Sequence, residues 1–131
     1  MKRWEVALAI TGAICMILGA RWVRRGELPK LEISIAGNGC NMPVTSIQPP
    51  AGVNPAGSAV LIHGLAANRR LMTYLGEDFA GHGFTAYLPD LPGHGDNTAP
   101  FTFLRAQQCA TVAVESLTRT GKIDPKTTIL V

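Results

Sequence analysis

The segments "SAVLIHG", residues 58–64, and "FTAYLPDLPGHGDN", residues 84–97, decide the fold of this chain. The first predicts a short buried strand that ends at His63 and Gly64, because a compact apolar run bounded by turn residues is typical of such strands. The second predicts a strand that runs into a loop rich in glycine and proline. The segment between them, residues 68–83, predicts a helix that ends at its glycines.

The flanking segments extend this pattern in both directions. Residues 30–37 and 42–50 alternate like strands around the hairpin signal Asn38-Gly39. Residues 102–120 have the apolar spacing of a helix, and residues 127–131, "TTILV", predict a strand that is buried on both faces. The expected apolar residues of that helix are Leu104, Cys109, Val112, Ala113 and Leu117. The order predicts an α/β fold with a mostly parallel sheet and helices on both faces.

The strand that ends at His63-Gly64 is a candidate catalytic feature. Ligands of such sheets bind at the carboxyl ends of the strands, where this strand delivers the backbone N–H of Leu65. Gly64 allows another group to approach the main chain closely, and a free N–H there can stabilise an oxyanion. The competing interpretation is structural: His63 caps the strand end and Gly64 makes a turn.

The loop after the second strand contains three residue types that also bind metals. Asp90, His94 and Asp96 invite a metal-site interpretation, but we expect a tight structural loop, shaped by Gly93 and Gly95, in which Asp90 bonds the backbone. No metal and no cofactor is expected. The glycines match neither the dinucleotide-binding pattern nor the P-loop pattern.

Together these features resemble the N-terminal part of the α/β-hydrolase superfamily, particularly its esterase, lipase and serine-aminopeptidase-like members. The resemblance covers residues 31–131 and rests on the strand ending His-Gly, the helix, and the strand ending D-x-P-G-H-G. One departure is Asn97, where the family often has serine. The resemblance implies that "TTILV" is the strand that leads to the nucleophile elbow, G-x-S-x-G.

The family's order of residues implies that the catalytic groups lie after Val131. The nucleophile, the acid and the histidine follow the elbow strand in that order, and the serines of this chain lack the flanking glycines of an elbow. Only the Leu65 N–H, half of an oxyanion hole, corresponds to a residue present here. We therefore expect residues 30–131 to be a partial hydrolase domain, truncated before the elbow and inactive alone.

The resemblance implies an intact enzyme in which serine attacks an ester, thioester or amide carbonyl. A same-fold alternative uses an aspartate nucleophile on epoxides or haloalkanes. Another class of function also stays open, in which the chain is a non-catalytic membrane-tethered module or a truncated gene product.

The first 25 residues predict a membrane anchor. Residues 6–20 are apolar and uncharged, and Trp4 and Trp22 mark two interfaces of a span of about residues 4–23 that contacts the lipid bilayer. A cleaved secretory signal and a buried helix are the alternatives. The basic residues that follow the span favour a cytoplasmic C-terminal part by the positive-inside bias.

Charge and cysteine content exclude two further classes of site. Without residues 1–25 the net charge is −1, because 12 − 5 = 7 basic residues face 9 − 1 = 8 acidic ones. The remaining basic cluster, Arg69-Arg70, predicts a solvated turn, so no nucleic-acid partner is expected. Cys40 and Cys109 show no zinc-ligand spacing, and we interpret both as packing residues, with a bridge between them as the alternative.

Overall fold

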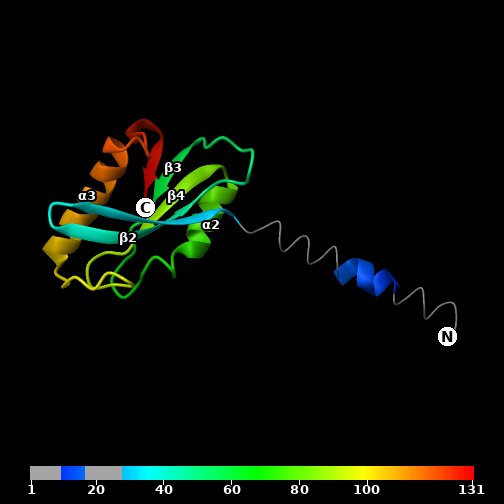
Figure 1. The fold of residues 1–131 in the computed structure, drawn as a ribbon, viewed down its shortest axis with the longest axis horizontal. Coiled ribbons are helices and arrows are strands. Elements are labelled where there is room, and N and C mark those ends of the chain that lie inside the picture. Colours follow the sequence, from blue (N-terminus) through cyan, green and yellow to red (C-terminus); the bar gives the residue numbers. More distant parts are fainter. Residues whose placement is uncertain (1–9, 17–27) are drawn as a thin grey trace.

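The computed structural model describes residues 10–16 and 28–131 (Figure 1). Residues 10–16 are helical and exposed, whereas most of the predicted span, residues 4–23, lies outside the described residues. Within the described ranges, no helix combines the length and the apolar character needed to cross a bilayer. The strands and helices labelled in Figure 1 all lie within residues 30–131.

A hairpin opens the domain, as the sequence predicts. Strands β1 (Lys30–Gly37) and β2 (Cys40–Ile47) pair antiparallel, with Gly37 opposite Cys40. Asn38 and Gly39 form the two-residue turn with φ angles of 48° and 76°. Two consecutive positive φ angles characterise the turn whose twist matches that of the paired strands, which is why Asn-Gly predicts it well.

Three further strands complete a five-stranded sheet in the order β1-β2-β4-β3-β5. They are β3 (Gly57–Val60), β4 (Phe84–Pro89) and β5 (Thr128–Leu130). β4 pairs antiparallel with β2 and parallel with β3, and β3 pairs parallel with β5. The prediction of a mostly parallel sheet is therefore wrong for this part of the fold, because the hairpin makes two of its four strand pairs antiparallel.

The two helices form where the sequence predicts them, with one shifted start. Helix α3 (Phe103–Arg119) begins after Thr102, whose side chain accepts the Arg105 N–H at 3.0 Å. Helix α2 (Thr73–Gly81) begins five residues later than expected, because turns occupy residues 69–72 and the Arg69 N–H bonds a side chain outside the helix.

The core has two layers, one on each face of the sheet. Neighbouring residues in the strands alternate between the layers: Val60 and Tyr87 pack with α3, and Ala59 and Leu88 pack with α2. The prediction of helices on both faces is confirmed (Figure 1). Of the five residues expected on the apolar face of α3, Leu104 is the exception, since it is 65% exposed.

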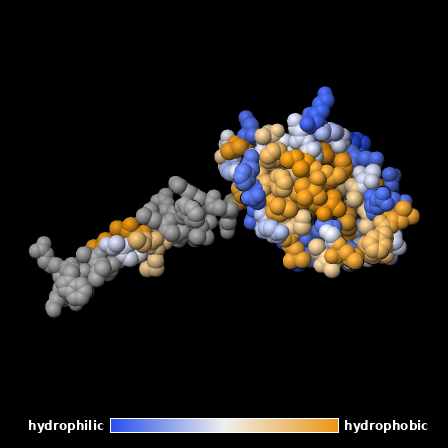
Figure 2. Space-filling view, turned by 180° about the vertical axis from the view of Figure 1, so that it is seen from behind, coloured by the Kyte–Doolittle hydropathy of each residue, from blue (hydrophilic) through white to orange (hydrophobic). Residues whose placement is uncertain are grey.

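Strand β5 lies at an edge of the described sheet. It pairs with β3 alone, and Ile129, Leu130 and Val131 are 41%, 63% and 48% exposed. The expectation of a strand buried on both faces is therefore wrong for the described chain. Figure 2 shows a continuous hydrophobic patch on one face of the domain. The exposed apolar residues of β5 form an edge that favours association with other strands.

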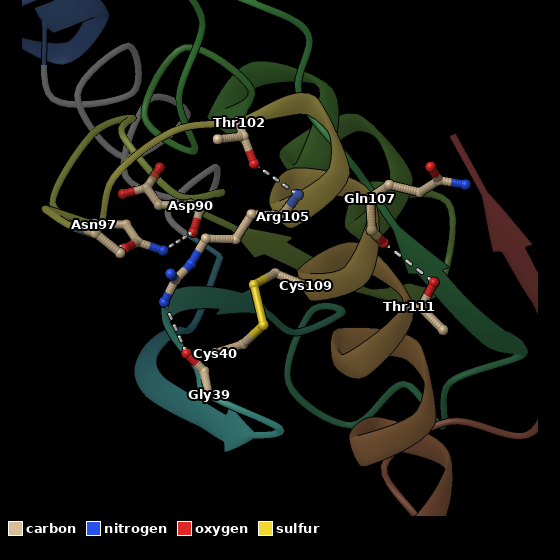
Figure 3. The surroundings of a disulfide bond; sticks show 10 residues. Gly39, Cys40, Asp90, Asn97, Thr102, Arg105, Gln107, Cys109 and Thr111 are labelled. Carbon is tan, nitrogen blue, oxygen red and sulfur yellow. Dashed lines mark hydrogen bonds between the residues drawn. A yellow bond between two sulfur atoms is a disulfide. The ribbon is translucent and has the colours of Figure 1, made fainter.

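A disulfide joins the hairpin to α3. Cys40, at the start of β2, bonds Cys109 across 69 positions of sequence (Figure 3). Both cysteines are buried, but they form a covalent bond, so the interpretation of them as packing residues is wrong and the alternative of a bridge is correct. Nearby, the Arg105 side chain donates to the Gly39 carbonyl at 3.1 Å, so the same helix holds the hairpin turn as well.

Candidate active site

The carboxyl ends of β3 and β4 carry two loops that contact each other. We call them the 63–67 loop and the 90–97 loop. The ladder of β3 continues beyond its last strand residue, since the Ile62 N–H donates to the Val131 carbonyl at 2.8 Å. The sheet therefore fixes the chain up to the residue before the first loop and places the end of β5 beside that loop.

The 63–67 loop is a tight turn. The Ala67 N–H donates to the Gly64 carbonyl at 3.2 Å, and Ala66 has a φ angle of 62°. A left-handed conformation costs a residue with a side chain about 1–2 kcal/mol, so surrounding contacts must hold it. Such strain is typical of functional loops.

The backbone N–H of Leu65 is available at this turn. Among residues 10–16 and 28–131, no acceptor receives this N–H, and the Leu65 side chain is 67% exposed. A Cβ added at Gly64 would meet nothing within 4 Å, so space for an approaching group exists beside the main chain. The turn can therefore present one N–H donor to a ligand.

His63 and His94 both bond the backbone of the opposite loop. His63, only 3% exposed, accepts the Leu91 N–H on Nε2 at 3.0 Å, and His94 accepts the Ala66 N–H on Nε2 at 3.4 Å. The His63 ring thus bonds the chain after β4, and this contact coexists with an available N–H at Leu65. No sequence pattern indicated the partners of His94.

Asp90 organises the 90–97 loop from a fully buried position. Its carboxylate accepts the Asp96 N–H at 2.9 Å and the Arg69 N–H at 2.7 Å, and its carbonyl accepts from the Asn97 side chain at 2.9 Å. The prediction that Asp90 bonds backbone is confirmed. In the part of the chain that the structure describes, no three His, Cys, Asp or Glu side chains are grouped to hold a metal.

Glycines give the 90–97 loop its shape, as expected. Gly93 and Gly95 have φ angles of 75° and 55°. A Cβ on Gly95 would overlap the carboxylate of Asp90, and one on Gly93 would lie 2.6 Å from the Cβ of Phe101. Both positions therefore require glycine for conformation and for space.

Arg69 is a residue of this site that the sequence interpretation missed. Only Arg70 occupies the predicted solvated turn, with its side chain 75% exposed, whereas Arg69 as a residue is 8% exposed. The Arg69 guanidinium binds Asp90 and reaches Asp96 at 2.8 Å and Glu32 at 3.2 Å. A buried aspartate requires a counter-charge, so Asp90 was the signal that could have identified it.

The charges of this cluster hold Arg69 in its ionised form. Burial by itself lowers the pKa of Arg69, but the hydrogen bond and the charge of Asp90, helped by Asp96 and Glu32, outweigh it and raise the pKa above its ordinary value. Arg69 therefore ties together β1, the 90–97 loop and the segment that follows the 63–67 loop.

The comparisons with known proteins agree with this arrangement. The model of the alpha/beta hydrolase family matches residues 59–131, more than half of the chain. No curated protein matches the sequence.

Solved structures show the same fold. An alpha-beta serine hydrolase homologue from Coxiella burnetii is 13% identical with a TM-score of 0.63, over 76% of this chain and 50% of that one. A serine hydrolase without lid from Xanthomonas campestris is 17% identical with a TM-score of 0.61, over 77% of this chain and 49% of that one. An epoxide hydrolase mutant from Vigna radiata is 22% identical with a TM-score of 0.53, over 72% of this chain and 28% of that one.

The chain thus spans about half the length of the first two structures. Helices α2 and α3 and the loops at the ends of β3 and β4 lie within the residues that the family model matches. The chain belongs to the alpha/beta hydrolase family.

Proposed function

We propose that this chain supplies the oxyanion-binding half of a hydrolase whose activated serine attacks an ester, thioester or amide carbonyl. The observation that carries the proposal is the Leu65 N–H, which no acceptor in the described chain receives, at the carboxyl end of β3. In α/β folds that end of the sheet binds ligands. Attack on a carbonyl creates a negative oxygen, and a preorganised N–H stabilises that charge more than the original carbonyl.

The nucleophile is expected from the segment that follows β5 in this family. Ser34, Ser46, Ser58 and Ser116 lie within β1, β2, β3 and α3, whereas an elbow serine stands on a turn between a strand and a helix. The Val131 N–H donates to the Val60 carbonyl at 3.0 Å, so β5 ends beside the 63–67 loop. We therefore propose that residues 1–131 alone have no hydrolase activity.

An aspartate nucleophile is the second candidate, and the likeness to epoxide hydrolases such as the Vigna radiata protein supports it. Aspartate would open an epoxide and form an ester with the enzyme. Water would then hydrolyse that ester, and the same Leu65 N–H would bind the oxyanion of this second step.

The experiment compares Leu65→Pro with Leu65→Ala in the complete gene product that contains this chain. Proline removes the N–H, whereas alanine keeps it and removes a mostly exposed side chain. We expect kcat on p-nitrophenyl acetate to fall about 10²–10³-fold in Leu65→Pro and to change little in Leu65→Ala. An unchanged kcat in a folded Leu65→Pro variant would refute the proposed role.

Labelling with a fluorophosphonate identifies the nucleophile in the same preparation. A modified serine beyond residue 131 supports the serine hydrolase, and a modified serine within residues 1–131 contradicts the proposed location. Epoxide turnover without labelling indicates the aspartate enzyme. The 131-residue chain alone should show neither labelling nor turnover.

We also propose that residues 4–23 attach the domain to a lipid bilayer. The support is the uncharged segment of residues 6–20 between Trp4 and Trp22. The full chain should stay with membranes through an alkaline carbonate wash, and a chain without residues 1–25 should not. Release of the full chain by the wash would contradict the anchor.

A further inference from the structure

The two histidines of the site form a reciprocal pair between the loops. Each ring belongs to one loop and accepts a backbone N–H of the other: Leu91 donates to His63, and Ala66 donates to His94. The ring centroids are 5.1 Å apart. The 63–67 loop is therefore bound to the 90–97 loop at both of its ends, with Leu65 between the two bonds.

The backbone partners determine where each ring carries its proton. His63 Nδ1 lies 3.0 Å from the Gly64 carbonyl, and His94 Nδ1 lies 2.9 Å from the Pro92 carbonyl. A carbonyl only accepts, so each Nδ1 carries the hydrogen, and a backbone N–H only donates, so each Nε2 must be bare. Both bridges therefore require neutral imidazole with the proton on Nδ1.

The strained residue of the turn depends on one of these bridges. Ala66, with its left-handed φ angle, gives its N–H to His94, the partially buried ring of the pair. A second proton on His94 would place an N–H against the Ala66 N–H and remove this bond. The direction of the adjacent Leu65 N–H would then no longer be fixed from the 90–97 loop.

Among the described residues, the nearest charged side chains are paired with one another and do not replace the bridge. The other side of His94 is covered by the Phe101 ring, at 5.2 Å between centroids. The charged residues of the two loops and of the segment between them that the structure places here are ion-paired with one another: Arg69 with Asp90 and Asp96, and Arg70 with Asp96.

We propose that His63 and His94 are positioning residues that aim the Leu65 N–H, and that they do so only as neutral Nδ1–H rings. This inference rests on the proposed function of Leu65 as an oxyanion donor. The 63–67 loop would loosen when a second proton on His94 removes the bond to the Ala66 N–H.

NMR spectroscopy of the full 131-residue chain, labelled with ¹⁵N and kept in a mild detergent, tests the pair without any turnover. In the wild type, the His63 and His94 ring spectra should show the proton on Nδ1. The Leu65 amide peak should move when acid protonates His94. A proton on Nε2 of His94 would overturn the proposal.

Three variants separate the bridge from mere packing. His94→Phe keeps a ring beside Phe101 but has no acceptor, so Ala66 amide exchange should accelerate about fivefold or more while the Tyr87 amide stays protected. His94→Gln offers an oxygen acceptor that does not titrate, so Ala66 should stay protected and the Leu65 peak should stop responding to pH. His82→Gln, at the exposed end of α2, is the matched control and should change nothing.

Two results with the variants would also overturn the proposal: unchanged Ala66 exchange in a folded His94→Phe variant, or a Leu65 peak that still follows pH in His94→Gln. Loss of the Tyr87 protection as well would assign His94 a general structural role and likewise count against it. The NMR signals report the hydrogen bonds of the loop, whereas kcat reports the role of the Leu65 N–H in catalysis. The two experiments can therefore contradict the two proposals separately.

Discussion

Arg69 binds the carboxylate of Asp90 twice, through its backbone N–H at 2.7 Å and through its guanidinium. One contact fixes the path of the chain after the 63–67 loop, and the other neutralises a charge that is fully buried. Asp90 in turn bonds the backbone of the 90–97 loop. This pair therefore helps to hold the two loops of the site together, beside the two histidine bridges.

Replacing Asp90 with alanine should destabilise the domain severely. The change leaves the buried Arg69 without its main partner and removes the acceptor of the Asp96 N–H. Breaking a buried ion pair from one side typically costs about 3–5 kcal/mol. Urea unfolding followed by circular dichroism measures the loss. Asp78→Ala is the control, since Asp78 has a 70% exposed side chain, and an equal loss in both variants would show that the Asp90 pair is unimportant.

Gly95→Ala should destabilise the domain more than Gly83→Ala. Both glycines have positive φ angles, 55° and 89°, so both variants bear a conformational cost of about 1–2 kcal/mol. Only at Gly95 does the new methyl group also meet the Asp90 carboxylate, and such overpacking adds about 1–3 kcal/mol. Thermal unfolding of the two variants gives the difference, and equal melting temperatures would contradict the crowded geometry of the loop.

Tyr87 should make the stability of the domain fall in alkali. Burial raises the pKa of its hydroxyl above the ordinary 10.0, against the opposing effect of Ser46. Above about pH 10 the unfolded chain therefore releases this proton first, so the free energy of unfolding decreases until the pH passes the raised pKa. Tyr87→Phe should remove this part of the decrease in urea unfolding between pH 8 and 11. Tyr74→Phe, at a 72% exposed site, should leave it in place.

Reduction of the Cys40–Cys109 bond should lower the stability of the domain. The bond closes a loop of 69 residues, for which chain-entropy arguments give about 4 kcal/mol. Unfolding with and without dithiothreitol, and of a Cys40→Ala/Cys109→Ala variant, measures the effect. Cys15→Ala should behave as wild type, because Cys15 is unbonded and lies outside the domain. A reductant effect that persists in the double variant would have another cause.

The features that the sequence predicted correctly are those encoded by neighbouring residues. Asn38-Gly39 specifies its turn by its own backbone preferences, and the apolar spacing of residues 102–120 indicates α3. The His-Gly strand end and the glycine loop are likewise local patterns. These sufficed for the order of the elements and for the position of the 63–67 loop.

The missed features depend on residues far apart in the chain. Arg69 is buried only because Glu32 and Asp90 approach it from β1 and from the end of β4. The bond between Cys40 and Cys109 likewise depends on the packing of α3 on the hairpin. Helix α2 starts late for the same reason, because a distant carboxylate takes the Arg69 N–H. No local pattern contains these contacts.

The bond between β2 and α3 also bears on which side of a membrane the domain works. Glutathione and thioredoxin keep cytosolic thiols reduced, whereas secreted and periplasmic proteins retain their cross-links. We therefore propose that residues 28–131 lie in an oxidising compartment, whereas the basic residues after the predicted span favour a cytoplasmic C-terminal part. Cells denatured without reductant in a thiol-alkylating reagent should then yield a chain in which Cys40 and Cys109 are still joined and unmodified.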